Sequence, residues 1–335
     1  MQKRRVFSLI VPCYNEGENI ETYYEQTSGV IGKLLSAGTI SDYEFLFVND
    51  GSKDDTLGKI RALSQTDKHL HYISFTRNFG KEAAMLAGLE NCVGDVIAIM
   101  DADLQDPPEL MLEMFSKMDA ESDCECVAAR RVSRKGEPVV RSFFARVFYH
   151  LINRISNVEI AEGARDYRLM SRRMLDSILT LKEKSRFSKG LFVWPGYKTC
   201  YVAYENVERT AGKSKWSFWK LFRYAMDGIT SFSVAPLQLS SAIGLLFFTV
   251  AFLAVVFFVI QKLFFGISVQ GYALLICSIF LLGGLQLLCI GVLGQYLAKV
   301  FIEDKRRPDY VVLECLLDQE VVSKGEKAEN TDHED

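Results

Sequence analysis

The chain has 335 residues and a formal net charge of −3, which is enough length for one large domain or two ordinary ones. The charge excludes a general electrostatic attraction to nucleic acid, so nucleic acid is not an expected partner. Eight cysteines occur without a C-x-x-C pair. This argues against a zinc site or a disulfide framework and predicts reduced thiols in a cytosol-facing protein.

Strand and helix patterns alternate along the N-terminal part of the chain. We expect strands at 7–12, 43–50, 71–75 and 95–101, and helices at 20–35, 54–63, 81–91 and 107–118. The expected strands are apolar almost throughout, which is typical of a parallel sheet covered on both faces. The sequence therefore predicts an α/β fold with a mostly parallel sheet and helices on both faces. In such sheets ligands bind beyond the carboxyl ends of the strands.

Polar side chains follow three of the expected strands. The first strand runs into P-C-Y-N-E at 12–16, the second into Asp50, and the fourth into Asp101, Asp103 and Gln105. Clustered carboxylates repel one another unless a cation lies between them. Oxygen ligands suit Mg²⁺ or Mn²⁺, which share their coordination with substrate phosphates. We therefore predict a metal at Asp101, Asp103 and Gln105 that bridges the protein to a diphosphate.

Each of these motifs alone has a simpler explanation. A single D-x-D is more often a polar turn, and Asp50-Gly51-Ser52 alone would be an ordinary turn. A P-loop is excluded because no G-x-x-x-x-G-K-[ST] is present. The coincidence of both motifs with two long apolar segments favours a functional site.

Two segments are long and apolar enough to cross a membrane. No charged residue occurs in 228–261 or in 263–298, and each stretch exceeds the roughly 20 residues that a bilayer requires. We predict transmembrane helices at about 238–261 and 271–297. The alternative is a buried helical hairpin in a soluble core, but core helices rarely stay apolar on every face for this length.

The flanking charges predict the orientation of these helices. Basic residues cluster at 213–223 and 299–307, whereas the loop between the helices carries only Lys262. The positive-inside rule therefore places both ends in the cytoplasm, and predicts an integral protein of the cytoplasmic (inner) membrane. We expect the acidic chain from Glu314 onward to be a disordered tail.

A basic segment precedes the apolar ones. Residues 130–154 hold seven basic groups against one acidic group, and their apolar side chains recur at helical spacing. Such a helix commonly lies in the membrane interface, although a core helix with a solvated basic face is the alternative. The segment 216–232 could be a second interfacial helix. Arg130, Arg131 and Arg134 would suit the phosphate of a lipid acceptor.

Several motifs together carry a resemblance. P-C-Y-N-E (12–16), V-N-D-G-S (48–52), R-N-F-G-K (77–81) and D-A-D-L-Q-D-P-P (101–108) resemble family 2 glycosyltransferases. More narrowly, the chain is similar to the polyprenyl-phosphate glycosyltransferases, the group of dolichyl-phosphate mannose synthase and bactoprenol glucosyltransferase. R-D-Y-R-L-M-S-R (165–172), F-S-K-G-L (187–191), R-T-A-G-K-S-K-W (209–216) and D-G-I-T-S-F-S (227–233) fit the same group. The resemblance covers about residues 5–310.

This resemblance implies a nucleotide-sugar-binding fold of the glycosyltransferase A type and a set of site residues. The donor would bind at Pro12, Tyr14, Glu16, Asp50, Lys81 and Asp101, with the metal on Asp101, Asp103 and Gln105. The catalytic candidates are Asp166, Arg209 and Lys215. Arg209 and Lys215 would face a phosphate. Asp166 is the family's candidate for a base, although pairing with Arg165 or Arg168 explains it equally well.

The implied reaction is the inverting transfer of one sugar from a nucleotide-diphosphate sugar to a polyprenyl phosphate at the cytoplasmic membrane face. UDP-glucose or a related UDP-hexose is the expected donor. Processive synthases carry Q-x-x-R-W and more spans, and this chain has neither, so we expect no polymer. A homo-oligomer is compatible with this interpretation.

Two other functions stay open. A membrane-anchored glycosyltransferase with a soluble acceptor would act on water-soluble substrates in detergent, and a non-enzymatic scaffold would not bind UDP with a metal. The expected regions are 1–135 for nucleotide sugar and metal, 136–232 for the acceptor, 233–300 for the two transmembrane helices, and 301–335 for a cytoplasmic tail with a disordered end.

Overall fold

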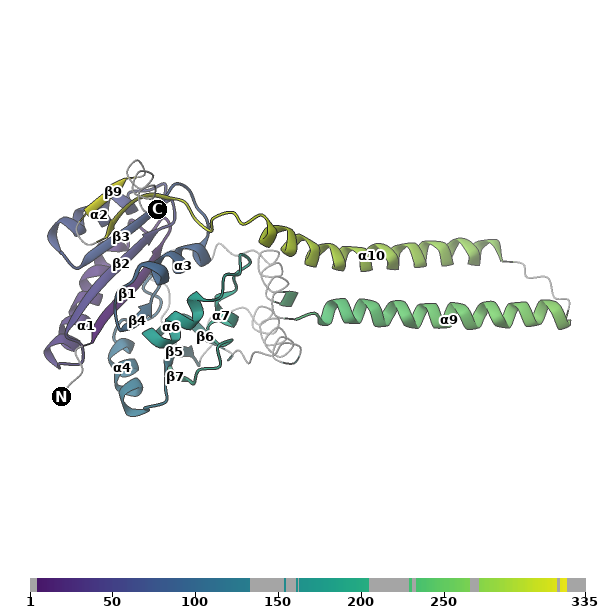
Figure 1. Ribbon diagram of the computed structural model, residues 1–335, viewed down its shortest axis with the longest axis horizontal. Helices are drawn as coiled ribbons and strands as arrows, with labels where there is room; N and C mark the ends of the chain where they lie inside the picture. Colours follow the sequence, from purple (N-terminus) through teal and green to yellow (C-terminus); the bar gives the residue numbers. More distant parts are fainter. Residues whose placement is uncertain are drawn as a thin grey trace, which may run out of the picture. The chain divides into compact units, whose positions relative to one another are not determined.

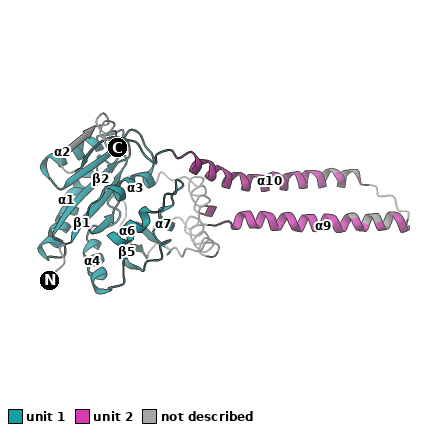
Figure 2. Ribbon diagram, in the orientation of Figure 1, with its two compact units in different colours: residues 1–153, 158–217, 307–335 teal, residues 154–157, 218–306 magenta. Residues whose placement is uncertain are grey.

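The computed structural model describes residues 5–132, 154, 161, 163–204, 229–230, 233–265, 271–317 and 320–323. The chain divides into two compact units (Figure 2). The first holds residues 1–153, 158–217 and 307–335, and the second holds 154–157 and 218–306.

The described strands of the first unit form one nine-stranded sheet in the order β7-β5-β6-β4-β1-β2-β3-β8-β9 (Figure 1). The strands are β1 (Val6–Cys13), β2 (Asp42–Asn49), β3 (Leu70–Phe75), β4 (Val96–Ile99), β5 (Cys126–Arg131), β6 (Ala164–Ser171), β7 (Thr199–Tyr204), β8 (Val312–Leu317) and β9 (Glu320–Ser323). The central strands β4, β1, β2 and β3 are parallel, whereas β6 and β8 run antiparallel to the neighbouring β4 and β3. The predicted α/β fold is confirmed.

Helices cover both faces of this sheet because its central strands are apolar on both faces. Along β1, Phe7 and Leu9 enter one hydrophobic core and Ile10 enters the other. The first core packs against α1 (Ile20–Ser36), α2 (Thr56–Thr66) and α4 (Leu110–Ala120), and the second against α3 (Lys81–Asn91) and α6 (Arg172–Leu179). The short helix α7 (Ser188–Leu191) lies between α6 and β7 in the chain. The four strands and four helices predicted in this region are all present.

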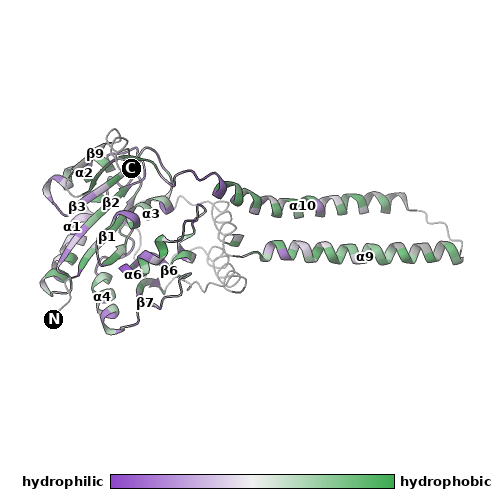
Figure 3. Ribbon diagram, in the orientation of Figure 1, coloured by the Kyte–Doolittle hydropathy of each residue, from purple (hydrophilic) through white to green (hydrophobic). Residues whose placement is uncertain are grey.

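The second unit contains two long apolar helices, α9 (Ala235–Phe265) and α10 (Tyr272–Asp304) (Figure 3). Both are long and apolar enough to cross a membrane, and almost none of the described side chains in their apolar stretches is buried. Large side chains such as Leu246, Phe248 and Leu287 are exposed. Exposure on this scale argues against core helices of a soluble domain, because water would solvate that surface unfavourably.

The expectation of a disordered tail from Glu314 onward is wrong for its first residues. Residues 312–317 form β8, which pairs antiparallel with β3, and 320–323 form β9. Cys315 is 5% exposed against the sheet, and both carboxylate oxygens of Glu314 accept hydrogen bonds from Arg61, at 2.8 and 2.6 Å. The short apolar run in VVLECLL stabilises this strand by burial, and the acidic composition further along the tail obscured it.

The expectation of reduced cysteines is wrong for one pair. Cys124 and Cys200 are joined by a disulfide. The pairing of β5 with β7, which sets Val127 opposite Cys200, brings the two residues together. Among the other described cysteines, Cys13, Cys92, Cys126, Cys289 and Cys315 stay as thiols.

Candidate active site

The sheet topology brings the ends of several strands to one edge. The carboxyl ends of β1, β2, β3 and β4 lie together because these strands are parallel. β6 runs the other way, with Arg168 opposite Ile99, so its first residues lie at that same edge. Asp101, two residues after β4, and Asp166, near the start of β6, therefore come close although 65 positions separate them in the sequence.

Lys81 joins these two carboxylates. Its Nζ lies 2.8 Å from a carboxylate oxygen of Asp101 and 2.6 Å from Oδ2 of Asp166, and its side chain is 41% exposed. Burial alone would lower the pKa of Lys81, but the charges of Asp101 and Asp166 raise it above its usual value. The ammonium is therefore a permanent cation between two acidic side chains.

The partner of Asp166 differs from both alternatives that the sequence offered. Arg165 pairs with Asp106, with its Nε 3.2 Å from a carboxylate oxygen, and Arg168 donates to the backbone oxygens of Arg165 and Asp166. The Asp166 carboxylate pairs with Lys81 instead. Burial would raise the pKa of Asp166, but Lys81 and Lys189 hold it well below its usual value. A carboxyl group of this kind stays ionised and is a weak base.

Asp103 and Gln105 face each other across a tight turn. Asp103 accepts a hydrogen bond from Nε2 of Gln105 at 2.6 Å and one from its backbone N–H at 3.2 Å, while Leu104 between them has a positive φ of 53°. Burial and the neighbouring charge of Asp101 raise the pKa of Asp103. A residue other than glycine in the left-handed region costs free energy, so this turn holds its side chains at a conformational cost.

The oxygen atoms at this edge can coordinate a divalent cation only if a bound ligand supplies further oxygen atoms. Among the described residues, no group of three or more His, Cys, Asp or Glu side chains is arranged to hold a metal. Asp103 nevertheless carries an unfavourable burial and repulsion from Asp101 that a cation would relieve. Mg²⁺ typically takes one or two carboxylates and completes its coordination with phosphates and water. The residues fit a cation shared with a diphosphate, and do not fit an all-protein metal site.

Asp50 organises the loop that leads to Lys81. Its carboxylate accepts hydrogen bonds from Nδ2 of Asn78 at 2.8 Å and from the backbone N–H groups of Phe79 and Gly80 at 2.6 and 3.0 Å. Burial raises the pKa of Asp50, and these backbone hydrogen bonds oppose that rise. Asp50 is the predicted donor-binding residue of this loop, and its contact with the loop before α3 was not predicted.

Gly51 allows that loop to approach closely. It has a φ of +62°, and a Cβ at this position would lie 2.3 Å from the carbonyl carbon of Arg77. Any other residue would push the 77–80 segment away from Asp50. Gly51, directly after Asp50 at the end of β2, is therefore required by packing as well as by turn geometry.

The residues after β1 lie against the loop after β2. The backbone N–H of Asn15 donates to Ser52, and that of Glu16 donates to Thr56, each at 2.9 Å. Tyr14 is 41% exposed, and Pro12 and Glu16 are half-buried. These expected donor-binding residues therefore lie on two loops that hold each other at the same edge as Asp101.

The predicted acceptor and catalytic cations are only partly described. Arg130 and Arg131 end β5 at the same edge, and the guanidinium of Arg130 lies 5.8 Å from the ring centroid of Tyr201. Arg134, Arg209 and Lys215 lie outside the described residues. The two expected interfacial segments also lie outside them, apart from Arg154 in 138–157, within the basic segment, and residues 229–230 in 216–232.

Two contacts around the site, one buried and one partly buried, were not predicted. Asp106, 3% exposed, accepts hydrogen bonds from Arg165 and from the hydroxyl of Tyr204, and so fastens the turn after β4 to β6 and β7. Glu82, next to Lys81, accepts from the backbone N–H and the hydroxyl of Ser188. No periodic pattern marks such pairs, because their members lie far apart in the chain. Only the motifs D-P-P and F-S-K-G-L suggested that these segments matter.

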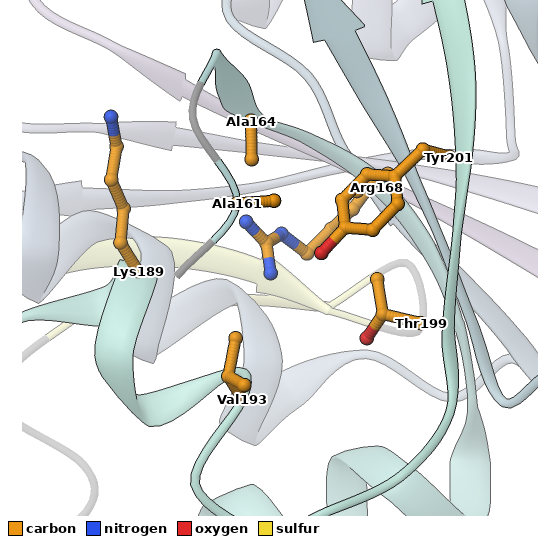
Figure 4. Close-up of a pocket in the computed structure, with 8 residues that line it drawn as sticks. Ala161, Ala164, Arg168, Lys189, Val193, Thr199 and Tyr201 are labelled. Atoms are coloured by element: carbon orange, nitrogen blue, oxygen red, sulfur yellow. The ribbon is translucent and has the colours of Figure 1, made fainter. Parts of the chain in front are cut away.

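A small pocket lies beside this edge, against β5, β6, β7 and the α7 segment (Figure 4). The guanidinium of Arg168 points into it, with Tyr201 and Thr199 on one side and Lys189 on the other. Arg168 is 3% exposed, donates to backbone oxygens, and lies 3.8 Å from the ring centroid of Phe192. Its contacts hold the start of β6, and with it Asp166, in place.

The comparisons with known proteins agree with this arrangement. The model of the family described as glycosyl transferase family 2 matches residues 8–179. This range contains β1 to β6 and the residues Asp50, Lys81, Asp101, Asp103 and Asp166. The chain belongs to glycosyl transferase family 2.

Curated relatives of this family 2 glycosyltransferase match nearly its whole length. It is 42% identical over 313 residues to a putative glycosyltransferase CsbB of Bacillus subtilis (strain 168), covering 93% of each chain. It is 42% identical over 305 residues to a bactoprenol glucosyl transferase of Shigella phage SfV, covering 91% of this chain and 97% of the relative. Matches of this length extend past residue 179 into the apolar helices.

The similarity to solved structures is more remote. A mannosyltransferase from Pyrobaculum calidifontis, PcManGT in complex with GDP-Man and Mn²⁺, aligns with a TM-score of 0.46 and 19% identity, covering 66% of this chain and 61% of that chain.

Proposed function

We propose that this glycosyltransferase transfers one sugar, with inversion, from a nucleotide-diphosphate sugar to a polyprenyl phosphate. The observation that carries this proposal is the 42% identity, over 91% of the chain, to a relative named bactoprenol glucosyl transferase. That similarity spans the strand-end site and the apolar helices together, as a lipid acceptor would require. We propose UDP-glucose or a related UDP-hexose as the donor.

The proposed chemistry is a single displacement. An oxygen of the acceptor phosphate attacks the anomeric carbon, and the bond from that carbon to the nucleotide diphosphate breaks. A phosphate oxygen is already deprotonated at neutral pH, so no strong general base is needed. The state of Asp166 agrees with a reaction that needs no strong base. Burial would raise the pKa of Asp166, but the neighbouring lysines lower it. We propose that Asp166 positions Lys81 and does not take a proton.

The donor diphosphate would lie at the shared edge of the strands. Pro12, Tyr14, Glu16 and the Asp50 loop would surround the nucleotide, while Asp101 and Asp103, with Gln105, would hold Mg²⁺ or Mn²⁺. The cation, when bound, would neutralise charge on the leaving diphosphate.

Cationic side chains would recognise the acceptor phosphate and the leaving group. Arg130 and Arg131 end β5 at the edge that holds Asp101, which supports a role in acceptor binding, together with Arg134. We propose that Arg209 and Lys215 contact the departing phosphates, where a preorganised positive charge stabilises the transition state.

We propose a membrane location with both helices crossing the inner membrane and the catalytic sheet in the cytoplasm. The basic flanks at 213–223 and 299–307 support this orientation. Residues 136–232, which include the sheet strands β6 and β7, would contribute the acceptor region.

One assay tests the proposed function. The purified full-length protein is incubated with Mg²⁺, a panel of nucleotide sugars, and either undecaprenyl phosphate or a water-soluble prenyl-free acceptor. The masses of the products are then determined by mass spectrometry. The proposal predicts a glycosylated lipid with at least one donor. Sugar transfer confined to the soluble acceptor would instead establish a membrane-anchored enzyme with a different substrate.

A further inference from the structure

The strand-end site already contains a cation that belongs to the protein. The Nζ of Lys81 lies 2.8 Å from Asp101 and 2.6 Å from Asp166, so it neutralises the carboxylate that a divalent cation would need. Asp103 does not pair with Lys81 and accepts a hydrogen bond from Gln105. The ammonium and a divalent cation would therefore compete for Asp101.

The contacts of Lys81 allow its tip to move while its backbone stays fixed. Lys81 begins α3, and the two backbone N–H groups before it donate to the buried Asp50. Its side chain is 41% exposed, and the contacts described for Nζ are with the two carboxylates. A flexible four-carbon chain on a fixed backbone can leave one carboxylate without leaving the other.

We propose that Lys81 competes with the divalent cation for Asp101. When cation and donor bind together, the ammonium leaves Asp101, keeps its contact with Asp166 and turns to the donor phosphates. This inference rests on the proposed function. The competition keeps the affinity for the cation alone low, and the donor diphosphate supplies the missing ligands. Cation and donor then bind cooperatively, because each removes part of the cost of displacing Lys81.

The proposal makes an unusual prediction for Lys81→Met. The variant should bind Mn²⁺ without nucleotide about tenfold more tightly than the wild type, because a competing positive charge beside Asp101 is gone. UDP should then increase its Mn²⁺ affinity less than it does in the wild type, and sugar transfer should fall. A lysine that only binds phosphate would leave Mn²⁺ affinity without nucleotide unchanged.

The measurement is a titration of free Mn²⁺ by electron paramagnetic resonance, with and without UDP, on the full-length protein in detergent. Lys33→Met is the charge-matched control, because Lys33 is an exposed lysine in the last turn of α1, away from the strand-end site, and it should leave Mn²⁺ affinity unchanged. The double variant Lys81→Met with Asp101→Asn should lose the gain, which locates the competition at Asp101.

A second variant keeps the test valid if Lys81→Met does not fold. Asp166→Asn removes the anchor that retains Lys81, so displacing the ammonium becomes costlier and Mn²⁺ should bind more weakly than to the wild type. Equal Mn²⁺ affinities in the wild type, Lys81→Met and Asp166→Asn would overturn the competition. Absence of Mn²⁺ binding to the wild type even with UDP would instead overturn the metal in the proposed function.

Discussion

At the scale of single residues, the site depends on side chains that serve more than one element. Asp50 at the end of β2 holds the loop before α3, and Lys81 at the start of α3 holds Asp101 and Asp166. The sequence predicted that these residues lie at one edge, because strand order and motif spacing suffice for that. It did not predict their partners, since a hydrogen bond between distant segments leaves no periodic trace.

Asp103 is the residue at which activity and stability should separate most clearly. Asp103→Asn keeps the size of the side chain but removes a charge from beside Asp101, so sugar transfer should fall by about 100-fold or more. The melting temperature should stay within about 2 °C, because the lost hydrogen bond from Gln105 is offset by relief of repulsion. Steady-state kinetics and thermal melts measure both, and near-normal transfer with Mg²⁺ would contradict the metal assignment.

Glu82 should make stability depend on pH. Burial raises its pKa, the Ser188 hydroxyl opposes the rise, and Asp166 adds to it. A carboxyl group with a raised folded-state pKa destabilises the fold once the pH exceeds its unfolded value of about 4.3. Glu82→Gln keeps an acceptor for Ser188, so its melting temperature relative to the wild type should rise from pH 4 to pH 8. A constant difference across that range would show that Glu82 is not perturbed by burial.

At the scale of elements, the central strands were predictable, whereas β8, between β3 and β9, was not. β1 to β4 are continuous apolar runs between turn residues, which is a strong signal for buried parallel strands. β8 is a short run after a long helix and before an acidic tail, and composition averaged over the tail concealed it. Its partner β3 lies more than 230 positions earlier in the chain.

Two substitutions in β8, one at a buried paired residue and one at the irregularity in its pairing with β3, test whether this strand stabilises the sheet. Cys315 is 5% exposed and Leu313 is 45% exposed. Cys315→Asp should destabilise the domain by about 3 kcal/mol or more through a buried unpaired charge, whereas Leu313→Asp should cost less than about 1 kcal/mol. Thermal melts of the full-length variants measure this, and equal effects of the two changes would contradict the observed pairing.

At the scale of the whole molecule, β8 constrains how the chain meets a membrane. The chain leaves the sheet after β7, passes through α9 and α10, and returns to the same sheet as β8. If both helices cross a bilayer, the start of α9 and the end of α10 are therefore on one side of it, and residues 266–270 are on the other. The sequence predicted this arrangement from charge alone, and the position of β8 supplies an independent constraint.

A membrane-impermeant maleimide tests that topology in intact cells. Cysteine introduced at Ser268, between the helices, should be labelled from outside, whereas cysteine at the exposed Lys53 should be labelled only after lysis. The unsubstituted protein gives the background from its own cysteines. Labelling of both positions from the same side would contradict a helical hairpin that spans the membrane.

The configuration of the lipid product tests the central claim most directly. The purified protein is given undecaprenyl phosphate, Mg²⁺ and its α-linked donor sugar, and the product is examined by mass spectrometry and by NMR of the anomeric proton. A single displacement at the strand-end site predicts one β-linked sugar on the lipid phosphate. An α-linked product, or a chain of several sugars, would contradict the account.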